Sequence, residues 1–132
     1  MQKIIFVVDD NDMNLIVAKE ALKNLYRVFT MLSGEKLFSL IEKVRPDLIL
    51  LDVYMPDMDG FEALGRLKEN SACKDIPVIL FSGTYDEAVE KRGYQMGVTD
   101  FMLKPYSASN LINKISAYLN TGGASADAGT ES

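Results

Sequence analysis

The sequence predicts a single doubly wound α/β domain in which five parallel β-strands alternate with five α-helices. Five short apolar or β-branched runs are separated by segments whose apolar residues recur every three or four positions. Three of the runs are apolar without alternation, which is typical of parallel strands covered by helices on both faces. Strands and helices that alternate in this order form one sheet with right-handed crossovers.

The strands and helices can be placed one by one along the chain. The predicted strands, each bounded by polar or turn residues, are 4–8, 27–31, 48–51, 78–81 and 101–103. The clear helical stripes are Leu15/Ala18/Leu22/Leu25 behind a cap at Asn11 or Asp12, Leu37/Ile41/Val44 after Ser33, Phe61/Leu64/Leu67, and Leu111/Ile115/Leu119 after Ser107. The fourth helix, at about 85–96, is the weakest because its interior Gly93 costs about 1 kcal/mol relative to alanine.

Length and composition limit the number of domains. The 132 residues are 48% hydrophobic and 25% charged, as in one globular domain with a proper core. We assign residues 1–120 to this domain and 121–132, which have few apolar side chains, to a flexible C-terminal tail or linker. Apolar runs are far shorter than the ~20 residues that cross a bilayer, so we expect no membrane span and a cytoplasmic location.

Charge and residue usage exclude several kinds of chemistry. The net charge is −5, and the 14 Lys and Arg residues are scattered, so direct contact with nucleic acid is not expected. The sequence contains no histidine, which removes Ser-His-Asp catalysis, His-ligated zinc and an internal phosphohistidine. Any chemistry must use carboxylates, hydroxyls and amines.

Polar residues follow four of the predicted strands at the point where each strand ends. They are Asp9-Asp10, Asp52, Ser82-Gly83 and Lys104-Pro105, and the carboxyl ends of parallel strands meet at one edge of the sheet. Three neighbouring carboxylates repel each other, so the cluster predicts a cation with oxygen ligands, Mg²⁺ or possibly Mn²⁺. With the Lys104 ammonium and the Ser82 hydroxyl, the set predicts a pocket for a phosphoryl group and Asp52 as an oxygen nucleophile.

The joint pattern resembles the receiver domain of two-component response regulators. It comprises an acidic pair after the first strand, "LLDVYMPDMDG" around the third, a serine after the fourth and Lys-Pro after the fifth, and it covers about residues 3–119. The resemblance implies a flavodoxin-like topology with strand order 2-1-3-4-5. It also implies a signalling switch, typical of bacteria, rather than an enzyme acting on a separate substrate.

The resemblance also implies roles for the metal site. Asp52 is the phosphoacceptor, Asp10 binds Mg²⁺ directly and Asp9 binds it through water. Asp52 and the backbone carbonyl of Tyr54 complete the protein's ligands.

Further roles concern the phosphoryl group and the switch. Ser82 bonds a phosphoryl oxygen, Lys104 pairs with the phosphoaspartate, and Phe101 takes the switch position that responds to Ser82. A cis peptide is implied between Lys104 and Pro105.

Partners follow from the same resemblance. The phosphoryl donor is expected to be a partner histidine kinase or histidine phosphotransfer protein. The domain is expected to catalyse its own Mg²⁺-dependent phosphorylation and autodephosphorylation. Phosphorylation then switches the surface around the fourth helix, fifth strand and fifth helix, which controls an output domain or effector protein that the sequence does not identify.

The same residues also allow other interpretations. Asp9-Asp10 alone is often a helix cap, and "MPDMDG" alone is often a turn. A haloacid-dehalogenase-type phosphatase needs a second acid two residues after the nucleophile, where this chain has Tyr54. A flavodoxin-like electron carrier needs a Ser/Thr-Gly-rich phosphate loop after the first strand. A receiver-like module that binds without being phosphorylated is the third alternative.

Overall fold

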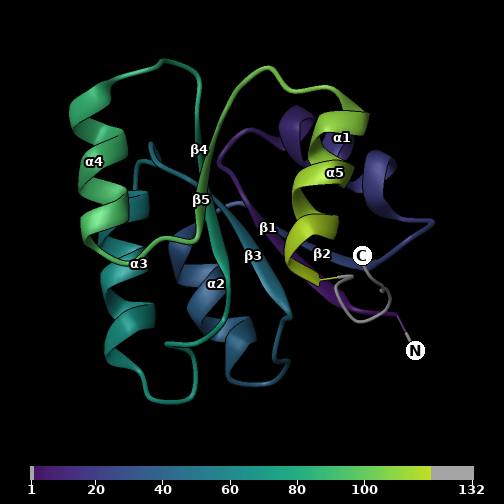
Figure 1. Ribbon diagram of the computed structural model, residues 1–132. Coiled ribbons are helices and arrows are strands. Elements are labelled where there is room, and N and C mark those ends of the chain that lie inside the picture. Colours follow the sequence, from purple (N-terminus) through teal and green to yellow (C-terminus); the bar gives the residue numbers. More distant parts are fainter. Residues whose placement is uncertain (1, 120–132) are drawn as a thin grey trace.

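The computed structural model describes residues 2–119 as a five-stranded parallel sheet flanked by five helices (Figure 1). The strand order β2-β1-β3-β4-β5 confirms the predicted fold class and topology. The strands are β1 (Ile4–Val8), β2 (Arg27–Met31), β3 (Leu48–Asp52), β4 (Val78–Ser82) and β5 (Asp100–Leu103). The helices are α1 (Asp12–Leu22), α2 (Gly34–Ile41), α3 (Gly60–Glu69), α4 (Glu87–Gln95) and α5 (Ala108–Leu119). The predicted tail, 121–132, lies outside the described residues.

Helices cover both faces of the sheet, which is why its central strands are apolar on both sides. Figure 1 shows α1 and α5 against one face and α2, α3 and α4 against the other. The first face buries side chains such as Leu15 and Ile115 against Ile5 and Val7 of β1. The second buries Leu37 and the α3 side chains against the alternate residues of β1, β3 and β4. The continuous apolar runs seen in the sequence therefore serve two cores.

Two helices end earlier than their apolar stripes predict. Helix α1 ends at Leu22, and Leu25, assigned to its stripe, is 51% exposed in the turn before β2, so that assignment was wrong. Helix α2 ends at Ile41, and Val44 lies beyond it, although Val44 still packs against the core. An apolar residue just past a helix continues the spacing without continuing the helix.

Helix α4 has a packing reason for its interior glycine. A Cβ atom at Gly93 would lie 3.1 Å from Leu80 Cδ1 and 3.4 Å from Val98 Cγ1. The glycine therefore lets α4 approach β4 closely. This close packing offsets the lower helix propensity of glycine relative to alanine.

Strand register brings the polar strand ends to one edge. Val8 pairs with Leu51, Asp52 with Phe81, and Ser82 with Leu103. The residue after β1, the last residues of β3 and β4, and the residue after β5 are therefore neighbours.

Among residues 2–119, no helix has the length and apolarity that a bilayer crossing requires.

Candidate functional site

Three carboxylates gather at this edge of the sheet. Asp9, Asp10 and Asp52 each offer an oxygen within 4.8 Å of the others. Asp9 is 0% and Asp52 4% exposed, whereas Asp10 faces solvent. Two nearly desolvated carboxylates and one accessible carboxylate form an oxygen donor set of the kind that Mg²⁺ prefers.

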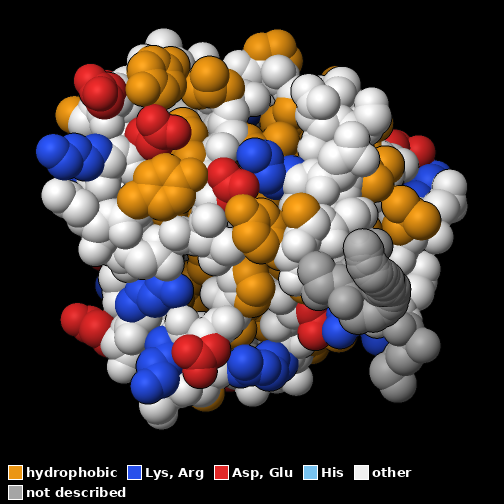
Figure 2. Space-filling view, viewed as in Figure 1, with side chains coloured by type: hydrophobic (Ala, Val, Ile, Leu, Met, Phe, Trp, Pro, Cys, Tyr) orange, Lys and Arg blue, Asp and Glu red, His pale blue; other side chains and the backbone are white. Residues whose placement is uncertain are grey.

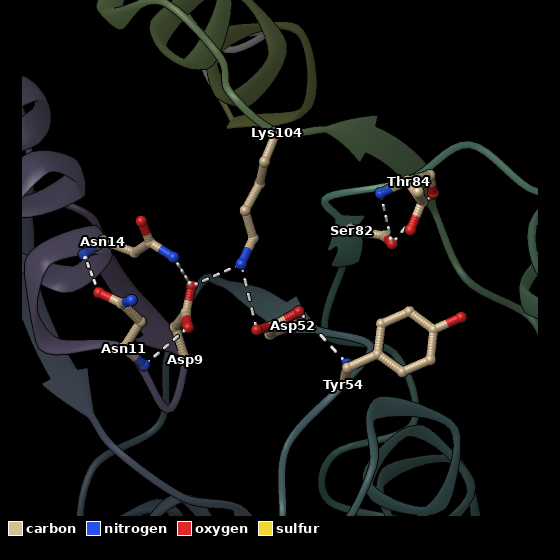
Figure 3. Close-up of polar contacts among 8 residues, drawn as sticks. All are labelled: Asp9, Asn11, Asn14, Asp52, Tyr54, Ser82, Thr84 and Lys104. Atoms are coloured by element: carbon tan, nitrogen blue, oxygen red, sulfur yellow. Dashed lines mark hydrogen bonds and ion pairs between the residues drawn. The ribbon is translucent and has the colours of Figure 1, made fainter.

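The Lys104 ammonium bridges the two buried carboxylates (Figure 3). Its Nζ donates to Asp9 Oδ2 at 3.1 Å and to Asp52 Oδ2 at 3.2 Å, and its side chain is 20% exposed. Nζ also lies 5.0 Å from the centre of the Phe81 ring, a cation–π distance. The peptide bond from Lys104 to Pro105 is cis.

Electrostatics make Asp52 an unusual carboxyl group. Burial, together with the neighbouring charge of Asp9, raises the pKa of Asp52 from 3.8 to about 6, although Lys104 and the Tyr54 N–H act in the opposite direction. Burial alone would lower the pKa of Lys104, but its bond to Asp9 and the charges of Asp52 and Asp9 raise it. One ammonium therefore only partly balances the two buried carboxylates.

Asp9 is held by donors that the sequence does not reveal. The Asn11 backbone N–H donates to Asp9 Oδ1 at 2.9 Å, and Asn14 Nδ2 donates to Oδ2 at 3.0 Å. Asn14 was missed because a polar residue in the first turn of a helix is usually solvated. Its position, one turn after the acidic pair that follows β1, is the signal that could have identified it.

Ser82 is buried close to the site but is turned toward its own loop. Its Oγ donates to the Thr84 carbonyl at 3.1 Å and accepts from the Thr84 N–H at 3.3 Å. Figure 3 shows this pair set apart from the Lys104–Asp52 contact.

Two further predicted residues lie at different depths. Phe101 is buried in the core between the sheet and α2–α4. Tyr54 is exposed, and its backbone N–H donates to Asp52 Oδ1 at 3.3 Å.

Two sets of contacts hold the loop from β3 to α3 in place: Gly60 packs against the backbone of Asp52, and Asp57 bonds to α2. A Cβ at Gly60 would lie 2.5 Å from the Asp52 carbonyl oxygen, so only glycine allows this approach. Asp57 accepts from the backbone N–H groups of Gly34 and Glu35, the first residues of α2. Asp57 also escaped sequence analysis, because its partners lie more than 20 residues away.

The sequence matches the profile of a known protein family over most of its length. The profile of the family described as "Response regulator receiver domain" matches residues 5–116. The chain belongs to this family. The match rules out the dehalogenase-type phosphatase and the flavodoxin-like electron carrier as family assignments. It confirms the resemblance to receiver domains that the sequence motifs indicate.

Individual relatives agree. The polar-differentiation response regulator DivK of Brucella anthropi is 30% identical over 120 residues, which cover 90% of this chain and 98% of that protein. A probable cyclic di-GMP phosphodiesterase of Vibrio cholerae is 31% identical over 118 residues, 89% of this chain and 27% of that protein. The structure of chemotaxis protein CheY4 of Vibrio cholerae aligns with a TM-score of 0.86 at 25% identity and covers 90% of this chain and 100% of that one.

The matched proteins differ widely in length. The chain spans between 7% and 56% of four curated relatives that it matches. What they share with it is the receiver domain of two-component response regulators, and switching upon phosphorylation is typical of this family. Receiver domains generally act as switches rather than as enzymes, although some relatives carry catalytic output domains.

Proposed function

We propose that Asp52 accepts a phosphoryl group from a phosphohistidine of a partner histidine kinase or histidine phosphotransfer protein. The observation that carries this proposal is the Lys104 ammonium, which bridges buried Asp52 and Asp9 at the sheet edge. An ammonium 3.2 Å from the acceptor oxygen can bind a phosphoryl oxygen with little movement. The 132 residues contain no histidine, so the donor histidine lies outside them.

The donor set fits a divalent cation. Asp10 is accessible and has room to bind Mg²⁺ directly, whereas the Asp9 carboxylate already accepts three hydrogen bonds, which suits contact through water. Asp52 and the Tyr54 carbonyl would complete the protein's ligands, and Mn²⁺ accepts the same oxygen donors. When bound, the cation supplies positive charge that stabilises the transferring phosphoryl group.

The chain's own residues perform the transfer. An Asp52 carboxylate oxygen forms the new O–P bond as the P–N bond of the donor breaks, and the electron pair of that bond stays on the imidazole nitrogen. The ionised form of Asp52 is the nucleophile, and a carboxyl with a pKa of about 6 is mostly ionised at neutral pH. Lys104 binds an oxygen of the transferred group. In the autodephosphorylation of the domain, water attacks the phosphorus atom, the Asp52 O–P bond breaks, inorganic phosphate leaves and the carboxylate is restored.

Ser82 links the phosphoryl group to the output surface. Its hydroxyl now bonds Thr84, and rotation toward the phosphoryl oxygens breaks both bonds to Thr84. The loop that starts α4 then shifts, and Phe101 on β5 adjusts with it. The resulting change reaches the surface formed by α4, β5 and α5.

That surface offers a place for a partner to bind. Figure 2 shows hydrophobic side chains gathered in the middle of this face, over β5 between α4 and α5. A groove of about 710 Å³ runs along β5 and α5 and is lined by residues that include Leu103, Tyr106 and Tyr118. An output domain or effector protein would bind this surface in one state of the switch, without contact between this domain and nucleic acid.

We further propose that the domain comprises residues 1–120, that 121–132 serve as tail or linker, and that the protein acts in the cytoplasm.

Phosphate uptake tests the proposal. With acetyl phosphate and Mg²⁺, the parent chain should gain the mass of one phosphoryl group, measured on the intact protein. Asp52→Asn should abolish this gain. Asp86→Asn, which keeps an oxygen to cap α4, should label like the parent. Equal labelling of Asp52→Asn and the parent would exclude Asp52 as the acceptor, and a parent that takes up no phosphate would favour a module that only binds.

A further inference from the structure

We propose that Asn14 is a positioning residue of the phosphoacceptor site, which holds the buried Asp9 carboxylate so that Lys104 can move from Asp9 to the phosphoryl group. The inference rests on the proposed function, because it assumes that Lys104 binds the phosphoryl group on Asp52. It assigns to the first turn of α1 a part in the chemistry at the end of β3.

Asp9 is a buried carboxylate whose two oxygens accept three hydrogen bonds. Its Oδ1 accepts from the Asn11 backbone N–H, and its Oδ2 accepts from both Asn14 Nδ2 at 3.0 Å and Lys104 Nζ at 3.1 Å. Asp9 is 0% exposed, so in the cation-free site bulk solvent does not contact its carboxylate in place of a lost donor. A buried carboxylate that loses a hydrogen bond pays much of the cost of its desolvation.

Lys104 is the one donor of the three that has to serve two carboxylates. Its Nζ donates to Asp9 Oδ2 at 3.1 Å and to Asp52 Oδ2 at 3.2 Å at the same time. As Lys104 turns to a phosphoryl oxygen on Asp52, its bond to Asp9 weakens. Asn14 donates to the same Asp9 oxygen, so this oxygen keeps a partner when the ammonium moves.

Helix α1 fixes the Asn14 side chain for this role. The Asn14 backbone N–H donates to Asn11 Oδ1 at 3.1 Å, which is the N-cap of the helix. Figure 3 shows the Asn14 amide directed at the Asp9 carboxylate beside the Lys104 ammonium. Asn14 and Lys104 also line one cavity of about 400 Å³ with Gly83 and Pro105, which gives the ammonium space to move.

The test measures the affinity for beryllofluoride, which binds carboxylate oxygens as a phosphoryl mimic, at saturating Mg²⁺ by calorimetry. Asn14→Leu removes the amide donor but keeps the branched shape of the side chain, and leucine favours the helix more than asparagine does, so α1 should not be weakened. Its beryllofluoride affinity should fall about tenfold, as expected for one lost hydrogen bond to a buried charge. In a Lys104→Met background, where no ammonium has to leave Asp9, Asn14→Leu should change the affinity less than about twofold.

Controls separate this role from a structural one. Tyr26→Phe loses a hydrogen bond to Ser116 at the opposite end of the sheet and should keep the parent's affinity even if its Tm falls. An unchanged affinity in Asn14→Leu, or an equal loss in both Lys104 backgrounds, would overturn the positioning role. Asn14→Ala provides the same comparison if the leucine variant does not fold. A parent whose beryllofluoride binding is absent, or survives Asp52→Asn, would instead refute the proposed function.

Discussion

Replacing Asp52 with asparagine should stabilise the metal-free domain, even though it removes the proposed acceptor. The pKa of Asp52 rises from 3.8 to about 6 in the folded state, mainly through burial and the charge of Asp9. The side chain is only 4% exposed, so the shift reports a real cost of holding the charge in the fold. Each pKa unit corresponds to 1.36 kcal/mol, so ionised Asp52 destabilises the folded state by about 3 kcal/mol at neutral pH.

The asparagine variant recovers most but not all of this free energy. An amide mimics the protonated carboxyl group, and its one oxygen can accept from Lys104. The Tyr54 N–H, which now donates to Asp52 Oδ1 at 3.3 Å, then loses its acceptor, at a cost of about 1 kcal/mol. The free energy of unfolding should therefore rise by about 2 kcal/mol, or roughly 6 to 10 °C in Tm for a domain of this size.

The pH dependence has a defined sign. Because the pKa of Asp52 is higher in the folded than in the unfolded state, the folded state binds more protons between about pH 4 and pH 6. The parent therefore loses stability as the pH rises through this window, and the asparagine variant does not. The advantage of Asp52→Asn should shrink by about 2 kcal/mol between pH 7.5 and pH 4.5.

Urea unfolding in EDTA, followed by circular dichroism at both pH values, measures these differences. Asp86→Asn is the matched control, because it changes the net charge equally while its side chain still caps α4. Added Mg²⁺ should stabilise the parent more than Asp52→Asn, since a ligand that binds only the folded site raises stability by mass action. Equal urea midpoints for the parent and Asp52→Asn in EDTA, or a difference in stability that does not depend on pH, would contradict the destabilising role of the Asp52 charge.

Three further predictions concern the surroundings of the site. Asp10→Ala should weaken Mg²⁺ binding more than Asp9→Ala in a calorimetric titration, because a direct ligand contributes more than one bridged by water; a reversed order would contradict the assigned roles. Asp57→Ala should lower the free energy of unfolding by about 1 kcal/mol in urea, because two N–H groups of α2 lose their acceptor. The bonds of Asp100 to Tyr118 and Lys114 outweigh its burial and lower its pKa, so Asp100→Asn should lose stability near neutral pH, by up to about 1 kcal/mol. This loss should vanish as the pH falls through the lowered pKa of Asp100. A loss that is the same at both pH values would argue against the ionic contribution of Asp100.

The sequence predicted the fold and the polar strand ends well because both depend on local patterns. A strand buried on two faces is a continuous apolar run, so its last residue is visible in the sequence. Parallel strands then bring those last residues to one edge, which placed Asp52 and Lys104 together without knowledge of side-chain conformation. The sequence also predicted that the neighbouring carboxylates repel each other, and the raised pKa of Asp52 agrees with this.

Side-chain direction and long-range capping could not be read in the same way. Ser82 lies at the predicted strand end, but its hydroxyl bonds Thr84 rather than the site, and rotamer choice leaves no trace in residue type. Asn14 and Asp57 act on atoms of other elements, and their spacing from those partners depends on how α1 and α2 dock. Gly93 was interpreted from helix propensity alone, whereas its packing against Leu80 is a tertiary contact.

The balance of charges explains why this site is suited to a reversible switch. Without a cation, one ammonium serves two buried carboxylates, so the resting site is held together but under electrostatic strain, as the raised pKa of Asp52 records. A divalent cation relieves the strain, and a phosphoryl group then adds negative charge that can recruit Lys104 away from Asp9. In the proposed function, the carboxylate repulsion that lowers the stability of the resting fold therefore reduces the free energy that a bound cation and one phosphoryl group would have to supply to change the state of the domain.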